Sequence, residues 1–128
     1  MKQPETIKIN DIEYVRKSDV VEPAKDLKGM KYCIVRTYSA GCFAAYVEKD
    51  WSEDGVRCAL LQKSRRLWYW KGANSLSQLS NDGVAVPEDC KFPQEVNDQT
   101  VFNVIEIIPA SKKAQESINS VTIWNYGS

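Results

Sequence analysis

Hydrophobic and polar side chains alternate along much of the chain, which is the pattern expected of β-strands that bury one face. Six segments show it and are rich in aromatic and β-branched residues, which favour strands: 31–38, 42–47, 56–61, 65–71, 100–108 and 121–124. The Asp54–Gly55 dipeptide is a strong signal for a tight turn after the second of these segments. Segment 100–108 is apolar on both faces, which predicts a strand in the centre of the sheet.

Two short segments in the second half of the chain switch to a helical pattern. Ser75, followed three residues later by Gln78, matches a capping box for a short helix that Gly83 ends. Ser111 is the expected N-cap of a second helix over residues 112–119. The order of these elements predicts an α+β fold, with one domain, a bent or barrel-like antiparallel sheet of about five or six strands, and two short helices.

Residues 1–30 are predicted to form an arm and linker ahead of the main domain, which spans 31–128. Two short apolar segments, 6–9 and 12–15, flank Asn10–Asp11, a pair that tolerates the positive φ angles of a hairpin turn. We therefore expect an N-terminal β-hairpin arm followed by a charged linker.

The composition excludes several kinds of chemistry. The chain of 128 residues has 17 basic and 17 acidic side chains and no histidine, so it lacks the commonest general base and the commonest zinc ligand. Its four cysteines form no C-x-x-C pair, and its carboxylates follow no recognisable metal-binding pattern. We therefore expect a protein that is not an enzyme and that needs no cofactor or metal.

No segment of the sequence has the pattern of a membrane span or a signal peptide. The N-terminus is polar, and the longest apolar runs, 42–47 and 104–109, are far shorter than a membrane-spanning helix. The expected location is the cytoplasm, where the cysteines would be free thiols.

The densest group of chemically active side chains is the run 63–71, in which four cations flank three consecutive aromatic rings. Guanidinium groups clamp phosphates or carboxylates, and Trp and Tyr rings stack on a base or anchor a protein partner. Because strand side chains alternate, the three rings cannot all point inward, so at least one is expected near the surface. The run is equally typical of a core strand with buried tryptophans and solvated charges, and the sequence leaves both interpretations open.

Two further groups are weaker. The run 36–41 combines a cation, three hydroxyls and two small residues, although a tight turn explains Gly41 equally well. The helix start within 72–79 offers free amides to an anion but lacks the spacing of a phosphate loop. The candidate residues for binding a ligand or partner come from the two runs 63–71 and 36–41: Arg36, Tyr38, Arg65, Arg66, Trp68, Trp70 and Lys71.

Charge is unevenly distributed although the total is zero. Residues 31–71 hold eight basic and four acidic side chains, whereas residues 72–128 hold three basic and seven acidic ones. Complementary charge on the two segments, together with the edge strands of a small sheet, predicts a homo-oligomer.

Four motifs resemble those of a small family of accessory proteins from tailed bacteriophages. They are RTYSAGxFAxY at 36–46, RRLWYWxGAxSLSQL at 65–79, CKFP at 90–93 and IEIIP at 105–109. The resemblance covers roughly residues 30–124 and implies a phage origin, but it implies no activity. The chain departs from the family pattern at Ala45, where Gly is usual, and at Ala110, where Cys is usual.

A phage accessory protein without catalytic groups is expected to bind something in its host. We therefore expect a non-enzymatic inhibitor of a host process, such as host defence, that binds a host protein or sequesters an anionic, nucleotide-like signal in the host cytoplasm. Two alternatives stay open. Basic residues interleaved with aromatic ones are typical of single-stranded nucleic-acid binding, although the zero net charge argues against it. The other alternative is a structural or assembly role in the virion.

Overall fold

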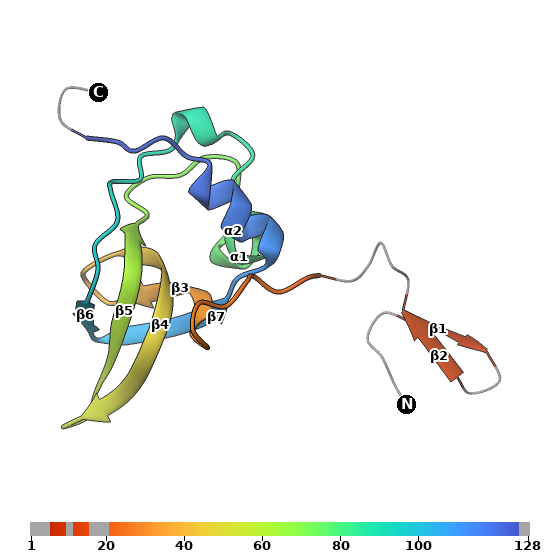
Figure 1. Ribbon diagram of the computed structural model, residues 1–128, viewed down its shortest axis with the longest axis horizontal. Coiled ribbons are helices and arrows are strands. Elements are labelled where there is room, and N and C mark those ends of the chain that lie inside the picture. Colours follow the sequence, from red (N-terminus) through yellow and green to blue (C-terminus); the bar gives the residue numbers. More distant parts are fainter. Residues whose placement is uncertain (1–5, 10–11, 16–20, 126–128) are drawn as a thin grey trace.

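The computed structural model describes residues 6–9, 12–15 and 21–125 of the chain. Its main element is one antiparallel sheet of five strands in the order β6-β5-β4-β3-β7 (Figure 1). In chain order these strands are β3 (Lys31–Thr37), β4 (Cys42–Glu53), β5 (Val56–Arg66), β6 (Gln99–Phe102) and β7 (Val104–Pro109). Together with two short helices, this bent sheet confirms the predicted α+β fold, and it is not closed into a barrel.

The two longest strands, β4 and β5, have 12 and 11 residues and curve together (Figure 1). Asp54 and Gly55 join them in a two-residue turn, and both have positive φ angles, of 52° and 78°. Such angles give a turn whose twist matches that of the flanking strands, so the predicted turn is confirmed.

The two edges of the sheet, β6 and β7, are consecutive in the chain and are separated only by Asn103. The φ angle of Asn103 is 57°, in the left-handed region that Asn tolerates better than most residues. Its carbonyl accepts a hydrogen bond from the Tyr38 amide at 2.9 Å. The sheet therefore bends round until its opposite edges meet at this corner.

The prediction of one central strand over 100–108 is wrong, because both halves of that segment lie at edges of the sheet. The apolar residues on both faces of this segment do not mean that both faces are buried. Val101 and Val104 are buried inside the curve of the sheet. Phe102 and Ile105, which follow them in the chain, are exposed.

The prediction of two separate strands over 56–61 and 65–71 is also wrong. β5 continues through the first segment and ends at Arg66, crossing a bulge near Lys63, whose φ angle is 49°. A bulge adds one residue to a strand without ending its pairing, and the alternation of the sequence does not reveal it.

The predicted strand at 121–124 is an extended segment with a single isolated bridge, between Ile123 and Phe92. It lies beside another irregular segment rather than in the main sheet. Its apolar and polar residues alternate as in a strand, but no strand of the main sheet is its neighbour.

Both predicted helices form, as α1 (Leu76–Asp82) and α2 (Lys112–Asn119), and a 3₁₀ turn, η2 (Pro87–Asp89), follows α1. The Ser75 hydroxyl accepts from the Gln78 amide at 3.1 Å, and the Gln78 side chain accepts from the Asn74 amide at 2.9 Å. The Ser111 hydroxyl accepts from the amide of the third residue of α2 at 3.0 Å. The predicted N-caps are therefore confirmed, and each satisfies an amide that the helix itself leaves free.

The helices cover one face of the sheet (Figure 1). Leu79 of α1 and Ile118 of α2 pack with Ile34 of β3 in one hydrophobic cluster, which Phe92 completes from the loop after η2. A second cluster, centred on Phe43, fills the inner side of the bend. Helix and sheet each bury an apolar side in this arrangement, which is how a small α+β domain obtains a core.

The predicted N-terminal hairpin is present as β1 (Thr6–Ile9) and β2 (Ile12–Val15), while its expected turn, Asn10–Asp11, lies outside the described residues. Residues 21–30 follow the main domain closely: the Ala24 amide donates to the Ala110 carbonyl at 3.0 Å. Within the described ranges, no helix has the length and apolar character needed to cross a membrane.

Candidate functional site

Three irregular segments lie side by side at the end of β5. The backbones of Tyr69 and Lys91 exchange two hydrogen bonds, of 3.2 and 2.7 Å, and the Trp124 amide donates to the Phe92 carbonyl at 3.0 Å. Segments 67–71, 90–93 and 121–125 thus form a small hydrogen-bonded layer, although they are far apart in the sequence.

Large side chains of this layer are exposed to solvent. Trp68 and Trp124 are 64% and 41% exposed, and their rings stack with centroids 6.5 Å apart and planes at 7°. The Lys91 ammonium nitrogen lies 5.6 Å from the centre of the Trp124 ring. Tyr69 and Ile123 are about half exposed. We call these five residues, Trp68, Tyr69, Lys91, Ile123 and Trp124, the tryptophan surface.

Arg65, two residues before the first of these segments, is hydrogen-bonded to the other two. Its side chain is buried and donates to four backbone carbonyls, at 2.7 to 3.1 Å: those of Phe92, Pro93, Ile118 and Val121. The planar, five-donor guanidinium suits this arrangement. Arg65 therefore links β5 to the segments that carry Lys91 and Trp124.

The charge of Arg65 is maintained inside the protein. Burial lowers the pKa of its guanidinium, while the neighbouring Tyr32 and Glu95 act in the opposite direction. An arginine stays protonated in proteins in spite of such shifts. With four of its donors engaged by carbonyls, Arg65 is a structural residue in this fold rather than a surface cation.

Arg66, the next residue, points to the outside. It lies opposite Phe43 in the β4–β5 ladder, and its guanidinium carbon is 4.9 Å from the centre of the Phe43 ring. Leu67 is buried between Arg66 and Trp68, both of which are exposed. Arg66 and Trp68 are thus both exposed, on either side of a buried leucine where β5 ends.

The other predicted site residues are dispersed. Arg36 forms an exposed ion pair with Glu106 at 3.2 Å, on β3 and β7, and Tyr38 is 80% exposed near the Asn103 corner. Trp70 is half-buried and packs against the helix-covered core.

Lys71 is exposed and lies 3.6 Å from Asp89 of η2. Of the seven candidates, only Trp68 belongs to the tryptophan surface, and the exposed Arg66 precedes it by two residues at the end of β5. The expectation that at least one ring of the 68–70 run lies near the surface is confirmed, because Trp68 and Tyr69 are both exposed.

Sequence reasoning missed Lys91, Ile123 and Trp124, and it did not select Tyr69 from the run 63–71 as a candidate. Lys91 stands in a loop with two prolines, and Trp124 lies at the end of a short segment, so neither has a local signal that links it to Trp68. The one signal in the sequence was that Trp124 is an aromatic residue outside the dense run 63–71. Only the fold brings these residues together.

Three of the four cysteine thiols are not activated as nucleophiles. Burial raises the pKa of Cys33 to about 11, and burial likewise raises the pKa values of Cys42 and Cys90. A thiol reacts as its thiolate, so these groups stay in their unreactive form near neutral pH. In the part of the chain that the structure describes, no group of three or more Cys, Asp or Glu residues is placed to hold a metal ion.

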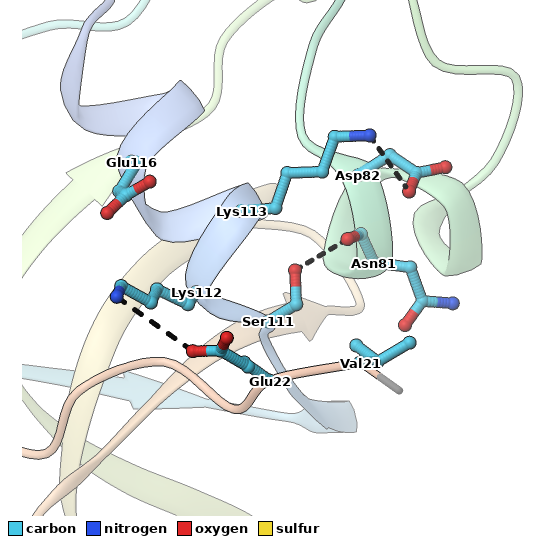
Figure 2. Close-up of a pocket in the computed structure, with 8 residues that line it drawn as sticks. All are labelled: Val21, Glu22, Asn81, Asp82, Ser111, Lys112, Lys113 and Glu116. Carbon is cyan, nitrogen blue, oxygen red and sulfur yellow. Dashed lines mark hydrogen bonds and ion pairs between the residues drawn. The ribbon is translucent and has the colours of Figure 1, made fainter. Parts of the chain in front are cut away.

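A hollow of about 470 Å³ lies elsewhere, between the end of α1, the start of α2 and residues 21–22 (Figure 2). Its two lysines are directed at carboxylates: Lys112 lies 3.9 Å from Glu22, and Lys113 lies 3.7 Å from Asp82. Glu116 adds a third carboxylate to the lining. The hollow therefore has no excess of positive charge to attract an anionic ligand.

Comparison with known proteins gives one match. A family model described as a domain of unknown function, DUF6948, matches residues 30–118. A search of the curated proteins found no match, and neither did a search of the solved structures. The matched range contains Trp68, Tyr69 and Lys91 and ends before Ile123 and Trp124.

Proposed function

The chain belongs to the DUF6948 family, a domain of unknown function, and we propose that it is a non-enzymatic phage accessory protein that inhibits a host process, such as host defence, by binding a host protein through the tryptophan surface. The site of action in this proposal is the host cytoplasm. Phage origin rests on the resemblance of its motifs, and the mode of action rests on the geometry at the end of β5.

The observation that carries this proposal is the exposed, stacked pair of Trp68 and Trp124. Water-exposed indoles are costly, and contiguous exposed aromatic groups mark interaction sites more often than ordinary surface. Trp and Tyr are also enriched among the few residues that supply most of the binding energy in protein interfaces. The pair is fixed by backbone hydrogen bonds and by Arg65, so little ordering would be needed on binding.

Several features favour a protein partner over a small nucleotide. Nucleotide sites are usually concave, with convergent donors. The described hollow has more carboxylates than lysines among its lining residues, and Arg36 and Arg65 are engaged within the protein. Ile123, next to Trp124 in the chain, adds an exposed aliphatic group, which a protein interface uses and base stacking does not.

Affinity capture from host lysate tests the proposal. The wild-type protein is compared with the double variant Trp68→Ala/Trp124→Ala and with Trp51→Ala, a matched control on a half-exposed tryptophan at the end of β4. We expect one host protein that the wild type and the control retain and the double variant loses. Purified, this protein should bind the wild type with a defined stoichiometry in a calorimeter and lose activity on binding.

Two results contradict the proposal. If the double variant retains the same host proteins as the wild type, the tryptophan surface is not the binding site. If instead calorimetry with cyclic oligonucleotides gives heat, or a twenty-nucleotide single-stranded DNA binds with steep salt dependence, a nucleotide or nucleic-acid ligand replaces the protein partner.

Self-association remains a prediction. In support, β6 and β7 each pair on one side only in the main sheet. A virion structural role stays the alternative if the protein is found in purified particles.

A further inference from the structure

We propose that the partner segment that binds the tryptophan surface is acidic, with carboxylates flanking an apolar or aromatic side chain; this inference rests on the proposed function. It is drawn from Lys91 of this surface and from Arg66, which precedes Trp68 by two residues. The rings would receive the apolar side chain, and the cations would receive the carboxylates.

Arg66 differs from the other arginines of the described chain. Arg36 and Arg57 form ion pairs with Glu106 and Asp50 at 3.2 Å, and Arg65 is buried against carbonyls. Arg66 is exposed, and its one described interaction is with the Phe43 ring. Arg36 and Arg57 thus each have a carboxylate, whereas Arg66, two residues before Trp68, has none among the described residues.

Lys91, at the Trp124 ring, has the same property. It is exposed and lies over the Trp124 ring, with no carboxylate within ion-pair distance among residues 21–125. Lys71, on the neighbouring segment, is instead paired with Asp89. Of the two lysines on the three segments of this layer, the one over the Trp124 ring is therefore the one without a carboxylate in the described part of the chain, and it shares this property with lysines elsewhere in the fold, such as Lys31 and Lys63.

The ring contacts make these cations suitable for binding. A cation over a ring face keeps its position while its N–H groups remain available at the outer side. Hydrogen bonds from such donors to a carboxylate are charge-assisted and are roughly twice as strong as neutral ones. Charges around an apolar centre also determine which partner is accepted, because a like charge is repelled.

Selection from a random twelve-residue peptide library displayed on yeast tests this inference. Purified wild-type protein is expected to enrich peptides with Asp or Glu next to an aromatic or aliphatic residue. The double variant Arg66→Glu/Lys91→Glu should bind the best of these peptides at least tenfold more weakly in fluorescence anisotropy. The control Lys31→Glu/Lys49→Glu, with the same change in net charge at exposed lysines on other parts of the sheet, should bind it as the wild type does.

The outcomes separate the two proposals. Peptides that bind through Trp68 and Trp124 but lack acidic residues, or that tolerate charge reversal at Arg66 and Lys91, overturn the acidic partner and leave the protein-binding surface in place. Enriched peptides whose binding is unaffected by Trp68→Ala/Trp124→Ala overturn the tryptophan surface itself. An equal loss of affinity in the Lys31→Glu/Lys49→Glu control shows that only net charge matters, which also overturns the inference.

Discussion

Arg65 and Arg66 are adjacent in the sequence but belong to two regions of opposite character. Arg65 belongs to the helix-covered core, where Phe92 and Ile118 are fully buried and the guanidinium donates its hydrogen bonds to carbonyls. Arg66 belongs to the outer surface at Trp68, where rings and cations face solvent. The comparison teaches that the same residue type stabilises the fold in one region and is available for binding in the other. A strand that alternates its side chains achieves this within two residues.

The largest expected effect is at Arg65. Arg65→Ala leaves four backbone carbonyls without their donor, and we expect the free energy of unfolding to fall by about 3 kcal/mol or more, because unsatisfied buried polar groups are costly. Arg66→Ala, the matched change on the outside, should cost about 1 kcal/mol or less. Urea unfolding followed by circular dichroism measures both, and equal losses would show that the two regions do not differ.

A second, smaller contrast compares two tryptophans of the same run. Trp70→Ala removes a half-buried ring from the helix-covered core and should cost about 2 to 3 kcal/mol, less than a fully buried tryptophan. Trp68→Ala removes a ring that packs mainly on Trp124 and should cost about 1 kcal/mol or less. Thermal unfolding of the two variants measures the difference. A larger loss for Trp68 would mean that the tryptophan surface is part of the stabilising core.

The smallest expected effect is a dependence of the free energy of unfolding on pH, caused by a buried tyrosine of the core. Burial in the helix-covered cluster raises the pKa of Tyr32 above its ordinary value of 10.0. The neutral phenol is therefore favoured in the folded state. The contribution of Tyr32 to the free energy of unfolding is fully present below pH 10. It falls as the pH rises above 10, because the phenol then ionises in the unfolded state, and the loss between pH 10 and 11 is about 1 kcal/mol.

The matched variants for this effect are Tyr32→Phe and Tyr38→Phe. Tyr32→Phe should remove this part of the alkaline loss in urea unfolding at the two pH values, and Tyr38→Phe, on an exposed ring, should keep it. Identical pH profiles for the two variants would place the alkaline loss on other groups.

The sequence predicted the parts of the fold that are determined locally. The turn at Asp54–Gly55 and the caps at Ser75 and Ser111 depend on a few adjacent residues, so their patterns were sufficient. The division of 100–108 at Asn103 was missed, because a positive φ at one Asn leaves no trace in the hydrophobic pattern.

The candidate site was predicted only in part, for a related reason. The bulge near Lys63 shifts the alternation of β5, and no pattern of residue types indicated that Arg65 would be the buried arginine and Arg66 the exposed one. Trp124 reaches Trp68 through contacts that span more than fifty residues of chain. Local sequence patterns carry no information about such contacts.

The hydrogen bonds of Arg65 to Ile118 and Val121 join residues 53 and 56 positions apart. A nascent chain on the ribosome that has exposed residues up to 117 therefore has one half of the indole pair and lacks two of the four carbonyls that accept from Arg65. The tryptophan surface is assembled only after residues 121–125 have emerged, so a partner cannot bind it on a chain that translation has not yet carried past this point.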